Sequence, residues 1–213
     1  MKKAIVLGST GMVGTQLIDL LLQSNDYAEV VSLVRRASGI THPKLNEQIV
    51  DFDKPETWSE FVRGDVLFSC MGTTIAKAKT KDNQFKIDYT YQYNVAEAAS
   101  KNGVPTYVLV SSAGANENSV TFYTHIKGLL DADVQKLPFK VITILRPGQL
   151  YGDRTENRVG EKIALSFMFT LNTLGLLKKL KPIHAREVAQ AMIKCADNKQ
   201  NNTLTLNAIF DLL

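Results

Sequence analysis

Cysteine and histidine are scarce in this chain of 213 residues, which contains two cysteines and three histidines. Cys70 and Cys195 stand far apart in the sequence, without the close spacing of zinc ligands and without enough partners for a disulfide framework. This scarcity argues against a metal site and against a disulfide-rich secreted domain. We therefore expect no metal, and a reducing compartment, for which the cytoplasm is the first expectation.

Long hydrophobic runs and an excess of one charge are also missing. The most apolar late stretch, 163–177, is interrupted by polar residues and is shorter than the roughly 20 residues that a membrane-spanning helix needs. The net charge is only +4, and basic residues alternate with acidic ones along the chain. We expect neither a membrane nor a nucleic acid as a partner.

The size and composition predict a single domain. With 45% hydrophobic and 22% charged residues, the chain can bury one substantial core but is too short for a separate substrate domain. We expect one domain over residues 1–213, with the substrate-side elements mainly from 151–183. The last sixty or so residues are less regular, and a small C-terminal cap over the substrate cleft is expected there.

Short β-branched runs alternate with longer segments in which apolar residues recur every three or four positions. Strands are expected at Lys3–Leu7, Val30–Val34, Gln48–Phe52, Val66–Cys70, Thr106–Ser111, Lys140–Leu145 and Thr203–Leu206, and helices at Gly11–Gln23, Asn83–Lys101, Phe122–Leu137 and Ala185–Asp197. This alternation predicts an α/β fold, a doubly wound parallel sheet covered by helices on both faces. Ligands bind such sheets at the carboxyl ends of the strands.

A glycine-rich turn, Gly8-Ser-Thr-Gly11-Met-Val-Gly14, joins the first expected strand to the first expected helix. Such a turn presents free backbone N–H groups and the positive end of a helix dipole to a phosphate. Gly8 permits the tight turn, Gly11 lets a pyrophosphate approach the backbone, and Gly14 lets the helix pack closely on the sheet. The spacing alone also fits an ordinary strand-to-helix turn, but its place at the N-terminal end favours a dinucleotide site.

Two arginines, Arg35 and Arg36, follow the second expected strand, where an acid would bind the ribose 2′-hydroxyl of NAD(H). Because each guanidinium offers a fork of donors to phosphate oxygens, NADP(H) is favoured over NAD(H). The alternative is that the pair merely keeps a loop soluble.

Two other strand ends carry candidate cofactor contacts. Asp51 could accept a hydrogen bond from an adenine amino group and Phe52 could pack on its ring, although acids at strand ends also form simple turns. Met71 and Gly72 would pass beneath the cofactor.

Tyr123 and Lys127 stand four residues apart on an expected helix, and therefore on one face of it. A free phenol ionises too far above neutral pH for ready proton exchange, and a neighbouring ammonium favours its ionised form. Lys127 could thus make Tyr123 a working acid or base. Upstream, Ser112 is the first choice for a hydroxyl that holds a substrate oxygen and Ser111 the second, because the register at a strand end is uncertain.

Taken together, the ordered motifs resemble those of the atypical short-chain dehydrogenase/reductases, in particular the branch of the Tat-interacting oxidoreductase. They are GSTGMVG, Arg35–Arg36, SCMGTT, VSSAGA, Tyr123-x-x-x-Lys127-Gly128 and RPGQLYGDR, and they span most of the chain. The resemblance implies the following cofactor contacts: Thr10, Gly11, Met12 and Val13 at the pyrophosphate, Arg35 and Arg36 at the 2′-phosphate, Met71 and Gly72 along the cofactor, and Leu150 and Arg158 at the nicotinamide.

The resemblance further implies that Tyr123 exchanges the proton and that Lys127 also holds the nicotinamide ribose. Many members of this family place asparagine in the helix after the fourth strand, whereas this chain has Asp88 and Asn94 nearby. A proton relay through that helix is therefore not expected. His125 and His184 are expected to be surface or packing residues.

The expected function is hydride transfer between NADP(H) and a carbonyl or alcohol substrate. Two alternatives stay open: a regulatory or scaffold protein that binds NADP(H) without turnover, and an epimerase or dehydratase that recycles its cofactor. The helical patterns of 83–101 and 122–137 could form a homodimer face, or only cover the sheet. A protein partner is equally compatible with the sequence.

Overall fold

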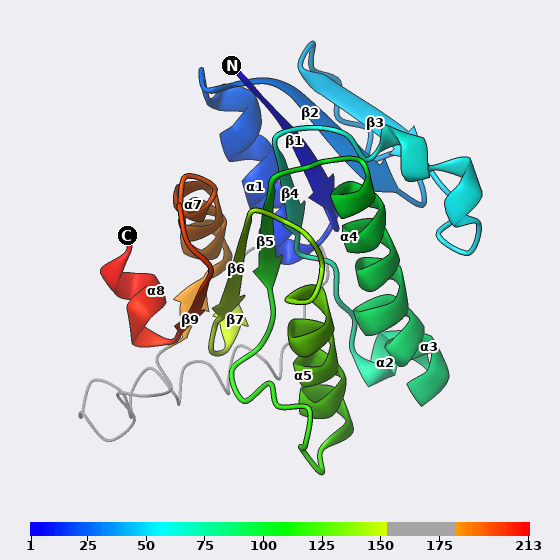
Figure 1. Ribbon diagram of the computed structural model, residues 1–213, viewed down its shortest axis with the longest axis vertical. Coiled ribbons are helices and arrows are strands. Elements are labelled where there is room, and N and C mark those ends of the chain that lie inside the picture. Colours follow the sequence, from blue (N-terminus) through cyan, green and yellow to red (C-terminus); the bar gives the residue numbers. More distant parts are fainter. Residues whose placement is uncertain (153–181) are drawn as a thin grey trace.

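The computed structural model describes residues 1–152 and 182–213, and in these ranges a seven-stranded parallel sheet forms the centre (Figure 1). Its strands follow the order β3-β2-β1-β4-β5-β6-β9. They are β1 (Lys2–Leu7), β2 (Tyr27–Val34), β3 (Leu45–Ile49), β4 (Val66–Ser69), β5 (Thr106–Val110), β6 (Val141–Arg146) and β9 (Asn202–Thr205). Two further strands, β7 (Leu150–Tyr151) and β8 (Ile183–His184), form a separate parallel pair.

Helices cover both faces of the sheet (Figure 1). One face carries α1 (Met12–Gln23) and α7 (Ala185–Cys195), and the other carries α4 (Tyr91–Lys101) and α5 (Phe122–Val134). The shorter elements are η1 (Pro55–Thr57), η2 (Ser59–Phe61), α2 (Ile75–Ala78), α3 (Lys81–Phe85), the π turn η3 (Lys86–Thr90) and α8 (Asn207–Asp211).

Strand β1 shows how the sequence fills both layers. Ala4 and Val6 belong to the core beneath α1 and α7, whereas Ile5 and Leu7 belong to the core beneath α4 and α5. Successive side chains of a strand point to opposite faces, so a continuous apolar run is what a strand buried on both sides requires. The predicted doubly wound parallel α/β fold is confirmed.

The strand order also fixes where a ligand can bind. β2 and β3 lie on one side of β1, and β4, β5 and β6 lie on the other, so the chain reverses its direction of winding between β1 and β4. A crevice forms outside the carboxyl ends of the strands at such a reversal. The glycine turn follows β1 and therefore lies in that crevice.

The third strand was predicted over Gln48–Phe52, but the structure places it over Leu45–Ile49. Parallel pairing with β2 sets this register, with Val30 opposite Leu45 and Val34 opposite Ile49. β3 is a partly exposed edge strand, and its polar residues do not form the apolar run by which the other strands were predicted. The apolar residues after it are buried as a side-chain cluster instead.

Two further expectations need correction. The single helix expected over Asn83–Lys101 is interrupted by the π turn η3 between α3 and α4. The small C-terminal cap is also wrong for residues 182–213, because α7 packs against α1 and β9 pairs with β6 in the main sheet. The remaining substrate-side residues, 153–181, lie outside the described residues, and so does Arg158.

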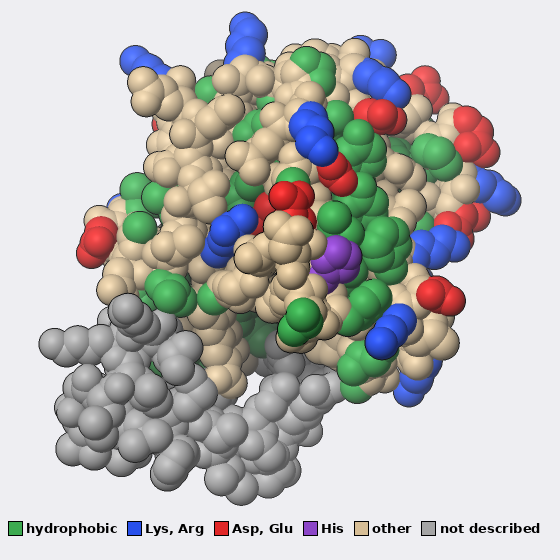
Figure 2. All heavy atoms as spheres, turned by 60° about the horizontal axis from the view of Figure 1, so that its bottom comes forward, with side chains coloured by type: hydrophobic (Ala, Val, Ile, Leu, Met, Phe, Trp, Pro, Cys, Tyr) green, Lys and Arg blue, Asp and Glu red, His purple; other side chains and the backbone are tan. Residues whose placement is uncertain are grey.

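Surface charge is mixed on the face that Figure 2 shows, where basic and acidic side chains are interspersed. Among the residues described, none of the helices has the length and apolar character needed to cross a bilayer. In the same ranges, no cluster of three or more histidine, cysteine, aspartate or glutamate side chains could hold a metal ion.

Candidate functional site

The glycine turn connects β1 to α1, and its backbone packs closely against neighbouring backbone atoms. Gly8 has φ +90, and a Cβ there would lie 2.5 Å from the backbone nitrogen of Met71. A Cβ on Gly14 would lie 2.1 Å from the carbonyl oxygen of Gly8. No side chain caps the N-terminus of α1, so its first N–H groups face the crevice with the positive end of the helix dipole. This is a cradle for a phosphate.

Two adjoining cavities open on either side of this turn. The outer cavity, about 300 Å³, extends from the turn to the end of β2, and Arg35, Phe52 and Tyr91 are among its lining residues. The inner cavity, about 450 Å³, extends from the turn to α5, and Tyr123 and Lys127 are among its lining residues. Both cavities share a floor formed by the turn and by the residues after β4, including Met71 and Gly72. Together they make an elongated site with different chemistry at its two ends.

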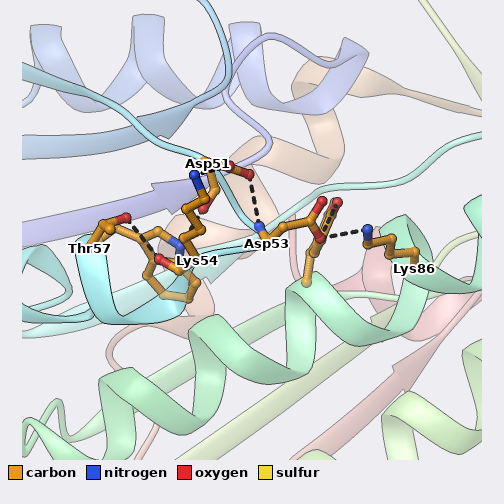
Figure 3. A network of polar contacts seen from close by, with 7 residues as sticks. Asp51, Asp53, Lys54, Thr57 and Lys86 are labelled. Atoms are coloured by element: carbon orange, nitrogen blue, oxygen red, sulfur yellow. Dashed lines mark hydrogen bonds and ion pairs between the residues drawn. The ribbon is translucent and has the colours of Figure 1, made fainter.

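Aromatic packing forms the far wall of the outer cavity. Phe52 stacks on Tyr91 with ring centroids 5.3 Å apart and meets Trp58 edge to face. Figure 3 shows the polar network beside them, in which Lys86 Nζ lies 2.6 Å from Asp53 Oδ1. The Tyr91 hydroxyl donates to the same carboxylate, at 3.0 Å. These contacts join the chain after β3 to the start of α4, and so fix the aromatic wall.

Asp51 and Arg36 are not among the residues that line the outer cavity. The Asp51 carboxylate accepts a hydrogen bond from the Asp53 backbone and lies 3.7 Å from Lys54 Nζ (Figure 3). It is thus turned toward its own loop, and this placement does not support the adenine contact predicted for it. Both arginines are exposed, but only Arg35 lines the cavity.

The inner cavity brings together residues from β5, α5 and β7. Tyr123 and Lys127 both line it, together with Leu150 and Ser111. Ser111 was the second choice in the sequence, but it is the serine whose buried side chain lines this cavity. Ser112, the first choice, is not among the lining residues, and its hydroxyl donates to the carbonyl of Ala113. The strand end therefore presents Ser111 to the cavity.

Lys127 is paired with a carboxylate that the sequence did not reveal as its partner. Its Nζ lies 3.0 Å from Asp88 Oδ1, with side-chain exposures of 3% for the lysine and 0% for the aspartate. Burial acts to lower the pKa of Lys127, but the carboxylate of Asp88 acts the other way, and the net pKa lies above its ordinary value. The lysine is therefore held as an ammonium.

The π turn aims Asp88 inward. Gln92 Nε2 donates to the backbone carbonyl of Asp88, at 2.8 Å, and the Ser69 hydroxyl donates to Gln92 Oε1. The backbone N–H of Thr73 donates to the Asp88 carboxylate, at 3.2 Å. Single π turns are frequent at functional sites because the extra residue redirects side chains. Here it links the end of β4 to α5 through one carboxylate.

A second buried pair lies one helical turn beyond Lys127. Asp131 is 1% exposed, and its Oδ2 accepts a 2.8 Å bond from Arg146 Nε. Burial raises the pKa of Asp131. The Ser111 side chain acts to lower the same pKa, so the hydroxyl of Ser111 and the carboxylate of Asp131 lie close to each other. Ser111 lines the inner cavity, whereas Asp131 lies behind it and lines neither cavity.

The cavity shape, the uncapped helix and the close-approach glycines fit a dinucleotide cofactor. A family model described as NAD(P)H-binding matches residues 8–199. The chain belongs to this NAD(P)H-binding family. Binding of NAD(P)H is therefore supported by both the match and the geometry.

Two relatives of this protein match most of its chain. Protein FMP52, mitochondrial, of Candida albicans is 36% identical over 205 residues, which are 93% of this chain and 90% of the relative. Protein HTATIP2 of Rattus norvegicus is 34% identical over 174 residues, 80% of this chain and 72% of the relative. The resemblance to the Tat-interacting branch is thus confirmed.

Solved structures share the fold at low sequence identity. The Bordetella bronchiseptica enzyme WbmH in complex with NAD+ superposes with a TM-score of 0.74 at 16% identity, covering 94% of this chain and 74% of that chain. A UDP-N-acetylglucosamine 4-epimerase from Methanobrevibacter ruminantium gives the same TM-score at 15% identity, covering 96% and 76%. At this identity the likeness shows the fold alone.

The expected cytoplasmic location is contradicted. The relatives from Candida albicans, Scheffersomyces stipitis, Debaryomyces hansenii and Saccharomyces cerevisiae, 36–39% identical to this chain, are all named mitochondrial. The expectation was drawn from cysteine content, and two free thiols are compatible with any reducing compartment.

The two histidines expected to have packing roles do so. His125 Nδ1 lies 2.6 Å from the carbonyl oxygen of Glu117 and ties α5 to the preceding loop. His184 caps α7, because its Nδ1 accepts from the Arg186 backbone while Glu187 accepts from the His184 backbone. From the sequence, Lys77 could attract an anionic substrate or cofactor phosphate or belong to a solvated loop, and the structure places it in the lining of both cavities. The sequence missed Tyr91 as a lining residue and Asp88 as the partner of Lys127.

Proposed function

We propose that this protein is an NADP(H)-dependent oxidoreductase that interconverts a carbonyl compound and an alcohol. One observation carries the proposal: the inner cavity joins a phosphate-binding glycine turn to Ser111, Tyr123 and Lys127. A nicotinamide cofactor, when bound, supplies or accepts a hydride. The side chains of the inner cavity have the groups that a carbonyl oxygen needs beside such a cofactor.

The proposed roles follow from position. The buried hydroxyl of Ser111 would hold the substrate oxygen, in place of Ser112. Tyr123, which is 38% exposed, would exchange a proton with that oxygen. Lys127, held as an ammonium one turn away, would donate to the nicotinamide ribose.

The preference for NADP(H) is part of the same proposal. Arg35 lines the outer cavity, no acid stands at the end of β2, and the neighbouring Lys77 lines both cavities. A guanidinium and an ammonium around one end of the site favour an additional phosphate on the ribose. Phe52 and Tyr91 would cover one face of the adenosine.

The test is to measure NADPH binding by calorimetry and NADPH consumption with a panel of aldehydes and ketones. Binding together with repeated turnover supports the proposal. Binding without consumption of NADPH on any compound would replace it with a regulatory or scaffold role. Conversion of a substrate to its epimer without net NADPH change would replace it with an epimerase.

A further inference from the structure

The loop that carries the two arginines also carries a serine, Ser38, three residues after Arg35 and two after Arg36. This loop, residues 35–44, connects β2 to β3 with neither helix nor strand. Both arginines are exposed, and Ser38 is partly exposed. Gly39 has φ +81, and a Cβ there would have no neighbouring heavy atom within 4 Å. A second protein can therefore approach the loop from outside.

We propose that Ser38 is a phosphorylation site for an arginine-directed serine/threonine kinase, and that the phosphate competes with the 2′-phosphate of NADP(H) for Arg35. Kinases of this class carry carboxylates in the groove that binds the substrate chain. Guanidinium groups two and three residues before the serine are complementary to such carboxylates. The modification site is independent of the proposed function, whereas its effect on the cofactor rests on that function.

The transfer needs ATP and the kinase as co-reactants. Ser38 Oγ forms a bond to the γ-phosphorus of ATP, and the bond from that phosphorus to the bridging oxygen breaks, which releases ADP. A base of the kinase accepts the hydroxyl proton. In the unmodified loop, the same Oγ accepts a hydrogen bond from the Ile40 backbone nitrogen, at 3.1 Å. An extended conformation in the kinase therefore gives up one local hydrogen bond.

The phosphate on Ser38 would have an acid on one side and two bases on the other. Glu47 Oε2 of β3 accepts a hydrogen bond from the Ser38 backbone nitrogen, at 3.0 Å. A phosphoserine carries about −1.5 to −2 charges at neutral pH, so this carboxylate repels it and the arginines attract it. Three residues of chain span at most about 11 Å, and bends at Arg35 and Arg36 shorten that span. Two long side chains can bridge it.

The effect on the cofactor follows from the position of Arg35, which lines the outer cavity. A guanidinium paired with phosphoserine no longer offers its fork of donors to a ribose phosphate, and two phosphates in one place repel each other. NADH lacks the 2′-phosphate, so its affinity should change little. Phosphorylation would thus act on the preference between the two cofactors.

The first experiment treats the full-length protein with ATP and the catalytic subunit of cAMP-dependent protein kinase, and peptide mass spectrometry locates the phosphate. We expect Ser38→Ala to lower incorporation at least about tenfold, and Arg36→Ala to slow it by about tenfold because a charged contact is lost. Ser119→Ala is the matched control, a partly exposed loop serine with Asn116 and Glu117 in place of the arginines, and should change nothing. No incorporation in the wild type, or equal incorporation in Ser38→Ala, would overturn the site.

The second experiment measures cofactor binding by calorimetry before and after phosphorylation. We expect the dissociation constant for NADPH to rise at least about tenfold and that for NADH to change less than about twofold. Phosphatase treatment should restore the first value, and kinase-treated Ser38→Ala should match the untreated protein. Unchanged NADPH binding, or equal losses for both cofactors, would overturn the competition. An untreated protein without preference for NADPH would count against the proposed function and the competition together, while incorporation would still decide the site.

Discussion

The two ends of the candidate site use charge in opposite ways. At the outer cavity, Lys86 of the π turn reaches outward to Asp53, and both side chains are roughly half exposed. At the inner cavity, Asp88 of the same turn reaches inward to Lys127, and both are buried. Exposed pairs are screened and contribute little, whereas a buried pair fixes both geometry and local charge. One short turn therefore carries an exposed ion pair on one side and a buried one on the other.

The sharpest test of this contrast removes one tyrosine hydroxyl at each end of the site. Tyr123→Phe should lower the turnover of a carbonyl substrate by about 10²- to 10⁴-fold, because it removes the proposed proton donor. Tyr91→Phe should change turnover less than about threefold, because that hydroxyl donates only to the exposed Asp53. Circular dichroism and NADPH titration check that both proteins fold and bind. Equal turnover in wild type and Tyr123→Phe would contradict the assignment of the inner cavity.

Stability should separate the two ion pairs in the same way. Asp88→Ala leaves the Lys127 ammonium buried without a partner, and we expect the free energy of unfolding to fall by about 3–5 kcal/mol. Asp53→Ala breaks an exposed pair and should leave the urea midpoint unchanged within error. Urea titration followed by tryptophan fluorescence measures both. A similar loss in the two variants would remove the distinction between the ends.

Cofactor preference tests the outer end. Arg35→Ala should weaken NADPH binding by about 10- to 100-fold, because charge-assisted bonds to the 2′-phosphate are lost, and should leave NADH binding nearly unchanged. Arg36→Ala is the matched control, and we expect a smaller loss because Arg36 does not line the cavity. Calorimetric dissociation constants for both cofactors give the ratio. An unchanged ratio in Arg35→Ala would overturn the preference for NADP(H).

The smallest effect is expected at Asp51. Its carboxylate faces Lys54 and the Asp53 backbone, so Asp51→Asn should change the affinity for NADPH by less than about twofold. The same calorimetric titration measures it. A tenfold loss would show that Asp51 turns toward the cofactor on binding and would restore the adenine contact predicted from the sequence.

The parts of the site that the sequence predicted are local ones. The turn from Gly8 to Gly14 is formed by consecutive residues, so the sequence shows it directly. Tyr123 and Lys127 are four residues apart and therefore share a helix face. The pairing of Asp88 with Lys127 joins two elements far apart in the chain, and it depends on a π turn that leaves no periodic signal. The choice between Ser111 and Ser112 stayed open in the sequence for a related reason, since one residue of register decides which side chain lines the cavity.

The dependence on contacts between distant segments also explains why the third strand was misplaced. Its pairing partner β2 sets the register of Leu45–Ile49, and the apolar residues that follow are used in the wall of the outer cavity. The sequence pattern located the interior strands, which are continuous apolar runs, and the edge strand β9, but it misplaced β3, whose position depends on its pairing with β2.

The parallel pairing of β7 with β8 sets Leu150 opposite Ile183 and Tyr151 opposite His184. Neighbouring strands lie about 4.8 Å apart, so the two junctions that flank residues 152–182 are pinned side by side, and His184 then starts α7 with its own cap. The short strand pair therefore anchors the first turn of α7 to the chain that leaves β6, and because α7 packs against α1, it holds the helix that follows the glycine turn in the same frame.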